Sequence, residues 1–595
     1  MGVQIIFIAA FVLLLAGLIC LKKTSEKLSF LRSAVICFIT ELCLGAVLGG
    51  VYTLVKIPVG LLSMGIGFFV FAVLAWGFVF FRREMQSYTV YATDIYAFSV
   101  ITIFFVYLFL RVFTSEIAIV YKNSDPGTHY GLALKVLQTG KLGRMYFTEL
   151  YNSLVMEMLQ PLLKEITLYK AFILSDTFFN YVNLLMFYIL LSTILKSKLL
   201  KAVSPFICIF YFLGWPFYSY VAGGYVYFGV GVTLFSYTVY LLLLLKESRE
   251  AWKDKLLFAM LALGIFGVTV CYMLFTPVLC LVIVVCLLYL LRERKITIPK
   301  ALLLKVIGIV LTLGIILFCI CFFGYFKGDI GRILTSLRIE GGIHRELYKD
   351  FLFLLPPVIF MGWHYYKQKK VDFLFLSWTV IAGVTVIVFF VYLFGAISGY
   401  YYYKLYYLNW VFLWLVCAEA AEYFVRQNKV MLYAYGIPVI TAVILTFLGT
   451  DRYLIKRDMI NASSPTLFPI YGVTMDYIQN SEETEEMDGL RSISLYINEN
   501  FEKTQAGIPF ICSIDKFNYP VWYRDFTGYS SKLADRGNDS SIPRYVGNIL
   551  EQLEQEGCVY FIIIKTADCY TENEALFEQY EAVYDNGYYG IYKMQ

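Results

Sequence analysis

Runs of about 20 apolar residues recur along the first three quarters of the chain and limit its fold more than any other feature. A helix crosses a hydrocarbon core about 30 Å thick with roughly 20 apolar residues. Backbone groups in lipid must be satisfied within their own segment, so such runs fold as helices. Fourteen runs fit, beginning near Val3, Val35, Gly60, Ile95, Ala171, Val203, Tyr225, Leu256, Thr276, Ala301, Phe351, Phe373, Leu405 and Val430. We therefore predict a mainly α fold, a polytopic transmembrane bundle of about 14 helices.

The composition agrees with a membrane protein. Of 595 residues, 59% are hydrophobic and 16% are charged. Soluble domains average about 45–50% apolar and 25% charged residues, so an ordinary soluble enzyme, a disordered chain and a collagen are excluded. Of the 13 cysteines, only Cys512, Cys558 and Cys569 lie outside apolar segments. They form no CxxC motif, so neither a metal site nor a disulfide framework is predicted.

Charge divides the chain into two predicted domains. Residues 1–450 carry 37 Lys and Arg against 21 Asp and Glu, whereas residues 451–595 carry 12 against 23. We interpret 1–450 as the transmembrane domain and 451–595 as a soluble α/β domain. In the latter, helices are expected at Leu490–Phe501, Tyr545–Glu556 and Glu574–Tyr580, and strands at Pro509–Ile514, Val559–Ile564 and Tyr588–Met594. The acidic run Glu482–Asp488 is expected to be a solvated loop.

The distribution of Lys and Arg among the short loops predicts the orientation. Every second loop is rich in these residues, and such loops stay in the cytoplasm. Both termini are then extracytoplasmic, as are the loops at 114–169, 324–349 and 396–404 and the acidic terminal domain. All the long, chemically varied loops therefore share one face of the membrane.

The first outside loop contains the sequence Asp125-Pro-Gly-Thr-His129. An Asp followed by Pro is typical of a helix start, as an N-cap and the first helical residue, and this explanation needs no function. Alternatively, the spacing of four places Asp125 and His129 on one helix face. A carboxylate there can take a proton from an acceptor, while the helix N-terminus receives a phosphate. His129 would orient Asp125, contact the phosphate or make an ordinary polar contact.

Further polar residues lie near the same predicted face. Asp176 is about six residues into the fifth apolar run, where it either pairs with Arg111 or takes part in catalysis. In the second outside loop, Arg332, Arg338 and Arg345 alternate with apolar residues. That pattern fits a helix lying in the membrane interface, and arginines there can also grip a lipid-linked phosphate.

The third outside stretch, Ser398–Tyr407, is rich in tyrosine and includes Tyr402, Tyr403 and Lys404. Tyrosines at a membrane–water boundary form aromatic belts. The cluster can instead stack on a sugar ring while Lys404 pairs with the phosphate. No nucleotide-binding, nucleic-acid-binding or metalloprotease motif is present, so neither a nucleic-acid partner nor nucleotide-driven chemistry is predicted.

A polytopic chain whose first large outside loop begins with Asp125, followed by His129 and a small-residue helix, resembles the GT-C superfamily. These are polyprenyl-phosphate-sugar-dependent glycosyltransferases, including protein O-mannosyltransferases and aminoarabinose transferases. The resemblance covers about Ile95 to Thr450 and a soluble outer domain, and it implies that Asp125 is the catalytic base. Many members carry a second acidic residue beside the first, where this chain has Pro126. Glu149, Glu157, Glu165 or Asp176 are the possible substitutes.

The leading hypothesis is a glycosyltransferase on the outer face of the cytoplasmic membrane. It would pass a sugar from a polyprenyl phosphate to an envelope glycan, lipid or protein. The resemblance implies inverting transfer without a cofactor, and the lack of an outside Asp-x-Asp motif makes metal independence the more natural expectation. The alternatives are a flippase or transporter for a lipid-linked glycan, and a non-catalytic assembly protein.

Overall fold

The computed structural model describes most of the chain. The described residues are 2–21, 28–82, 88–143, 146–247, 255–292, 329–338, 354–427, 469–502, 508–511, 518–528 and 546–594, with isolated residues or short runs between 304 and 323, at 351, between 430 and 436 and at 516. Most of them are helical. The prediction of a mainly α fold is thus confirmed.

The first part of the chain is a series of helices. They are α1 (Gly2–Leu21), α2 (Phe30–Leu54), α3 (Leu61–Arg82), α4 (Ala92–Phe113), α5 (Asp125–Thr139), α6 (Phe147–Leu159), α7 (Tyr169–Ile194), α8 (Lys198–Leu213), α9 (Val226–Glu247), α10 (Lys255–Cys271), α11 (Phe275–Arg292), α13 (Ile330–Arg338), α15 (Leu355–Gln368), α16 (Phe373–Leu393) and α17 (Gly399–Gln427). Short 3₁₀ turns η1 (Gln160–Leu162) and η2 (Glu165–Thr167) follow α6, and a π-helical turn η3 (Phe217–Ala222) follows α8.

Eight of the described helices are long and apolar enough to cross a membrane, namely α1, α2, α3, α4, α7, α9, α16 and α17. The structure therefore supports a multi-pass chain but not the predicted count of about 14 spans. The runs near Val203, Leu256, Thr276 and Phe351 form the shorter helices α8, α10, α11 and α15. The runs near Ala301 and Val430 lie largely outside the described residues.

Polar contacts connect three helices of the bundle at the end opposite α5. The buried Asp94 carboxylate, at the start of α4, receives hydrogen bonds from Arg32 Nη2 at 2.6 Å and from Tyr188 Oη at 2.7 Å. These contacts join α2, α4 and α7. The short strands β1 (Leu28–Ser29) and β2 (Tyr88–Thr89) pair in parallel beside them. A buried carboxylate needs such partners because an unpaired one is costly.

The C-terminal region is a small α/β unit. Helix α19 (Pro469–Asn480) precedes α20 (Glu485–Asn500), β3 (Phe510–Ile511), α21 (Tyr519–Thr527), α23 (Val546–Gln555), β4 (Tyr560–Ile564), α24 (Asp568–Thr571), α25 (Glu574–Phe577), β5 (Glu581–Asp585) and β6 (Tyr589–Lys593). The strand order is β3-β4-β6-β5, with β3 and β4 parallel and the other pairs antiparallel. Three helices and three strands match their predicted positions to within a few residues.

Two sequence expectations are wrong here. The acidic run at 482–488 is not all loop, because α20 begins at Glu485 with Thr484 as its N-cap. The Thr484 side chain accepts from the Met487 N–H at 3.1 Å, and acidic residues in a first turn suit the helix dipole. The supposed outside loop 396–404 is likewise mostly helix, since α17 begins at Gly399.

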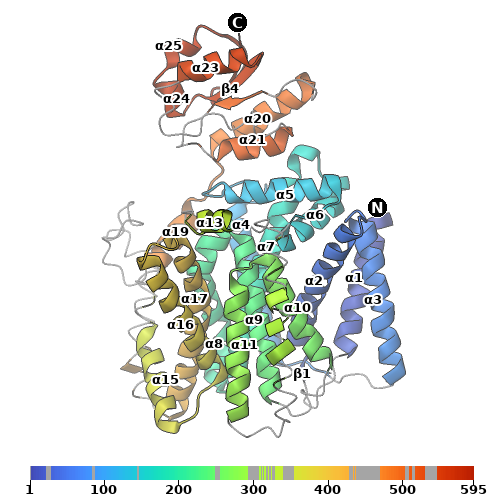
Figure 1. Cartoon of the computed structure of the whole chain (residues 1–595), viewed down its shortest axis with the longest axis vertical. Coiled ribbons are helices and arrows are strands. Elements are labelled where there is room, and N and C mark those ends of the chain that lie inside the picture. Colours follow the sequence, from blue (N-terminus) through green and yellow to red (C-terminus); the bar gives the residue numbers. More distant parts are fainter. Residues whose placement is uncertain are drawn as a thin grey trace.

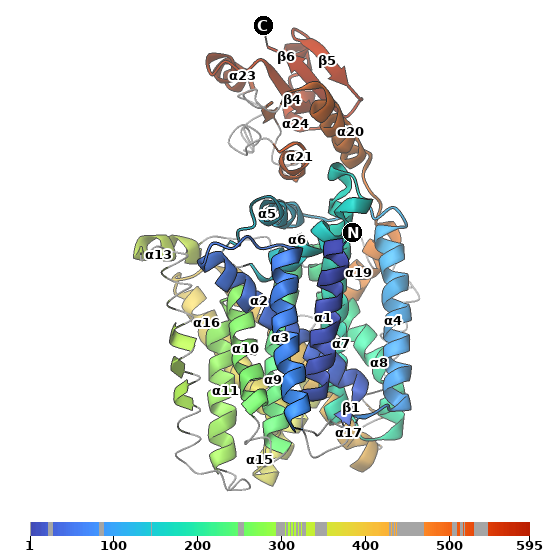
Figure 2. The ribbon, with the colours of Figure 1, turned by 90° about the vertical axis from the view of Figure 1, so that its right-hand side faces the viewer.

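Three of the short helices, α5, α6 and α13, lie at one end of the bundle. Figures 1 and 2 show α5 and α13 at the same end of the bundle, with the terminal sheet beyond α5. The start of α1 lies at that end too, while α15 and β1 lie at the other. Residues from the first predicted outside loop and the terminal domain are thus brought together.

Candidate functional site

The start of α5 does not use the Asp125 side chain as a cap. Ser124 is the N-cap residue, Asp125 is the first helical residue and Pro126 follows it. The predicted N-cap role for Asp125 is therefore wrong. The Asp125 N–H donates to Asn123 Oδ1 at 2.9 Å, but the carboxylate accepts no hydrogen bond from the part of the chain that the structure describes. The Asp125 carboxylate is therefore not used to cap α5.

A tight contact positions the start of α5 on the loop before α9. Gly224 has φ +70°, and a Cβ added there would meet Pro126 Cγ at 2.0 Å. The Asn123 amide also donates to the Gly223 carbonyl. Only glycine fits such a backbone with a ring against it. Asp125 is consequently held against the segment that carries Tyr225 and Tyr227.

His129 joins α5 to α6. Its Nδ1 lies 3.0 Å from Glu149 Oε1, and its ring lies 4.3 Å from the Tyr227 ring. The His129 side chain is 20% exposed. Burial lowers its pKa, but the Glu149 hydrogen bond and charge, with the charges of Asp125 and Asp176, outweigh burial and raise the pKa above 6.5. His129 is thereby favoured as an imidazolium next to Asp125.

Asp176 lies on α7 and is hydrogen-bonded to α6. Its Oδ1 accepts from Asn152 Nδ2 at 3.0 Å, and Ser175 Oγ donates to Asn152 Oδ1 at 2.6 Å. The predicted ion pair with Arg111 is wrong, because Arg111 instead donates to the Gln479 carbonyl of α19. Asp176 interacts electrostatically with His129, so three carboxylates (Asp125, Glu149 and Asp176) and one imidazole share the region.

Lys404 reaches the site from α17. It is buried, with its Nζ 3.6 Å from the Tyr400 ring centroid and 4.9 Å from that of Tyr272. Cation–π contacts of this kind stabilise an ammonium group that has lost water. The Asp125 carboxylate is the charge that acts on it electrostatically. Lys404 is thus a second basic side chain that interacts electrostatically with Asp125.

Tyrosine rings contact the two basic side chains, Tyr227 at His129 and Tyr400 at Lys404. Burial raises the pKa of the Tyr225 hydroxyl above its ordinary value, and the Asp125 charge raises it further. The Tyr227 and Tyr400 hydroxyls interact with each other. The resulting arrangement is a carboxylate at a helix N-terminus, flanked by His129 and Lys404 and walled by aromatic rings. Chemically, it can accept a proton and hold an anion side by side.

The structure does not bring every predicted residue to this site. Arg332 and Arg338 are exposed on α13, and the prediction of an amphipathic helix here is confirmed. Arg332 pairs with Asp329 at 3.4 Å. Arg345 lies outside the described residues. Tyr402 and Tyr403 contact each other, with Tyr402 also against Phe389 and Tyr392 of α16.

Four carboxylates were predicted as possible helpers of Asp125. Glu149 and Asp176 are within the site, whereas Glu157 and Glu165 line a separate cavity near the other end of α5. Sequence spacing did not single out Glu149, and it missed Asn152, Tyr225 and Tyr227 as site residues, whereas Tyr400 belongs to the predicted tyrosine cluster Ser398–Tyr407. Tyr225 and Tyr227 lie at the start of a predicted apolar run, and Asn152 lies within the predicted outside loop 114–169, so no local pattern joins them.

Within the described ranges, no group of three or more His, Cys, Asp or Glu side chains is placed to hold a metal ion. Comparison with protein-family models and with curated proteins finds no match to this chain.

Proposed function

We propose that this protein is a GT-C-type membrane glycosyltransferase. It transfers a sugar from a polyprenyl-phosphate donor to an envelope glycan, lipid or protein. One observation carries the proposal. The Asp125 carboxylate accepts no hydrogen bond from a described residue and stands at a helix N-terminus, where it interacts electrostatically with two basic side chains, His129 and Lys404. A general base beside an anion site is what this transfer requires.

Asp125 is the base of the proposed reaction. The acceptor oxygen attacks the anomeric carbon from the side opposite the phosphate, and its proton passes to the Asp125 carboxylate. The new carbon–oxygen bond forms while the bond between the anomeric carbon and the phosphate oxygen breaks. Polyprenyl phosphate leaves with that electron pair, so the configuration at the anomeric carbon inverts. The reaction needs no cofactor, and the lipid-linked sugar is the co-substrate.

Lys404 and His129 bind the leaving phosphate in this proposal. Positive charge near the departing group lowers the barrier most when the groups are already in place. Glu149 is a positioning residue that keeps His129 protonated and oriented. Asp176 is a second positioning residue that acts through Asn152. Tyr225, Tyr227 and Tyr400 provide faces on which a sugar ring can stack.

The topology belongs to the same proposal. About fourteen spans, with α8, α10, α11 and α15 among the shorter ones, would put both termini outside the cytoplasmic membrane. The common end for α5, α13, the terminal sheet and the start of α1 supports this orientation (Figure 2). Arg332, Arg338 and Arg345 then face anionic lipid or the donor at the outer surface.

The test is a transfer assay with the full chain in liposomes. A panel of radiolabelled polyprenyl-phosphate sugars is supplied with envelope extracts as acceptors, and released polyprenyl phosphate is measured. The proposal predicts release of the lipid phosphate in step with labelling of an acceptor. If no donor is consumed but a fluorescent lipid-linked glycan crosses the bilayer faster than in empty liposomes, the chain is a flippase instead.

A further inference from the structure

A large hollow lies near the opposite end of α5 from Asp125. It has a volume of about 1110 Å³ and lies between the start of α3, the C-terminal half of α5, and α6 with its following turns. Gln138, which lines it, is 13 residues beyond Asp125. At a rise of 1.5 Å per residue this separation is about 20 Å. The cavity is therefore separate from the Asp125 carboxylate.

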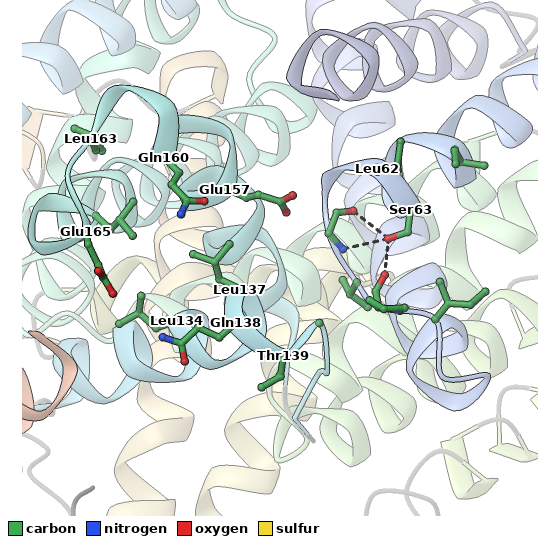
Figure 3. A pocket seen from close by; sticks show the side chains of 17 residues that line it. Leu62, Ser63, Leu134, Leu137, Gln138, Thr139, Glu157, Gln160, Leu163 and Glu165 are labelled. Carbon is green, nitrogen blue, oxygen red and sulfur yellow. Dashed lines mark hydrogen bonds between the residues drawn. The ribbon is translucent and has the colours of Figure 1, made fainter. Parts of the chain in front are cut away.

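The polar groups of this cavity are hydrogen-bond acceptors and amides. Figure 3 shows Glu157 pointing from α6 into the space between α6 and the start of α3. Glu157 Oε2 accepts from the Leu61 N–H at 2.9 Å, while Oε1 accepts no hydrogen bond from a described residue. Gln138, Gln160 and Glu165, with the hydroxyls of Ser63 and Thr139, complete the polar lining. Leucines such as Leu134 and Leu137 line the rest.

The charges of the cavity lining indicate which kind of lipid head group the cavity can bind. Glu157 and Glu165 are its only ionisable side chains, and both are acidic. Lys56, Lys141 and Lys164 are neighbours in sequence, but they are exposed and do not line the cavity. Carboxylate and amide oxygens accept hydrogen bonds from hydroxyls, and a phosphate placed here would face like charge. The lining therefore suits an uncharged head rich in hydroxyl groups.

An apolar groove lies on another side of the C-terminal end of α6. It has a volume of about 400 Å³ and runs between α1, α2, α6 and α7. Its lining is apolar or aromatic except for Ser175 and the Tyr151 hydroxyl, and it includes Phe11, Phe38 and Met158. Since α1, α2 and α7 are all long enough to span a membrane, the groove lies at the depth of lipid chains. Such a groove accommodates a hydrocarbon tail.

We infer that the cavity and the groove together bind one uncharged glycolipid, with its sugar head at Glu157, Gln138 and Gln160 and its tail between α1 and α7. The two hollows flank the C-terminal end of α6 and the start of η1, where residues 157 and 160 line the cavity and residues 154, 155, 158 and 159 line the groove. A single amphiphile matches this change from polar to apolar lining. Ser175, at the groove, contacts Asn152 and so connects the tail site to Asp176.

The inference is tested by photolabelling the full chain in phosphatidylcholine nanodiscs. The probe is glucosyl-diacylglycerol with a diazirine in one acyl chain, and phosphatidylglycerol with the same diazirine is the comparison lipid. Mass spectrometry locates the labelled residues. The glucolipid should label residues of the groove on α1, α6 and α7, and it should label them more than the anionic lipid does. Because binding is measured directly, the outcome does not depend on glycosyl transfer.

Matched variants separate a specific site from general lipid contact. Leu137→Trp fills the cavity, whereas Leu132→Trp places the same ring on the exposed face of α5. Gln138→Leu combined with Gln160→Leu removes the amides without adding bulk. We expect Leu137→Trp and the double variant to reduce labelling about tenfold, a change of roughly 1.4 kcal/mol, and Leu132→Trp to leave it unchanged.

Three outcomes would overturn the inference. One is equal or stronger labelling of the groove by phosphatidylglycerol, which would show an anionic-lipid site. The second is labelling spread over the exposed apolar faces of α1 to α4 that no cavity variant changes. The third is no labelling of the groove by the glucolipid in a chain that remains monodisperse.

Discussion

At the scale of single residues, His129 is held between opposing influences. Burial favours the neutral ring, whereas Glu149 at 3.0 Å and the nearby Asp125 and Asp176 favour the imidazolium. The net effect raises the pKa above 6.5, so the charged form persists to higher pH than in a free histidine. Stability from this pair is fully present below pH 6.5 and is lost as pH rises through the raised pKa.

The first prediction follows from the raised pKa of His129. In Glu149→Gln, burial dominates and the His129 pKa falls, so the imidazolium is lost at lower pH. The alkaline limb of the kcat profile for transfer should therefore move to lower pH, with a loss of about tenfold or more near neutrality and partial recovery in acid. His129→Gln is the control and should lack this limb altogether. An unchanged alkaline limb in Glu149→Gln would show that the charge of His129 is not used.

The sequence could predict only part of this residue-scale picture. The spacing of four between Asp125 and His129 was sufficient to place both on one side of a helix, and both are in the site. Glu149 could not be chosen over Glu157, because the choice depends on how α6 packs against α5. Tyr227 and Lys404 come from α9 and α17, and no local pattern indicates that these helices meet at α5.

At the scale of elements, the contact between α5 and the loop before α9 positions the base. The second prediction is that Gly224→Ala moves the start of α5, since its Cβ would overlap Pro126. Transfer should fall by about tenfold or more, because small displacements of reacting groups are costly. Membrane insertion should remain normal.

The matched control for this change is Gly395→Ala. Gly395 has a similar φ of +71°, but no atom lies within 4 Å of an added Cβ. The backbone strain is thus shared by the two variants, while the clash with Pro126 is not. Equal activity in Gly224→Ala and Gly395→Ala would contradict the positioning role of this loop.

Element boundaries follow the sequence where local signals are strong. The α/β pattern of the terminal domain was predictable from its short apolar runs, and β4 and β6 lie where they were expected. The acidic run before Leu490 was misread because acidic residues are as typical of a helix first turn as of a loop. The tyrosine-rich stretch was misread because its polar composition hides the continuous helix α17.

At the scale of the whole molecule, the terminal domain rests on the helix that carries Asp125. Trp522 of α21 is 1% exposed and stacks on Tyr130 of α5 at 5.6 Å. A Cβ at Gly127 would lie 3.2 Å from the Trp522 ring. Arg491 also donates to the Tyr169 hydroxyl at 2.8 Å, which joins α20 to α7. The terminal domain therefore packs directly against α5.

The third prediction is that Trp522→Ala loosens this contact. Removing a buried Trp costs about 3–5 kcal/mol, so amide hydrogen exchange in α5 should speed up and kcat/KM for transfer should fall. Trp363→Ala is the control, because Trp363 is 53% exposed on α15 at the other end of the bundle. Unchanged exchange in α5 of Trp522→Ala would show that the domain does not support the site.

The division into a basic apolar part and an acidic terminal part was predictable from charge alone. The number of spans was not, because α8 and α15 are apolar but have only 16 and 14 residues. A hydropathy window cannot distinguish a short buried helix from a full span. The contact between the terminal domain and α5 depends on Trp522 and Tyr130, which are nearly 400 positions apart in the sequence.

The central claim is that Asp125 is the base of a glycosyl transfer. The decisive measurement compares transfer by the wild type and by Asp125→Asn, at equal abundance in liposomes. Asp476→Asn, an exposed carboxylate of α19 outside the site, is the matched control. Removing the base and its charge should reduce kcat about a thousandfold, and the control should be nearly unaffected. Full transfer by Asp125→Asn would contradict the claim and leave Asp125 without a catalytic role.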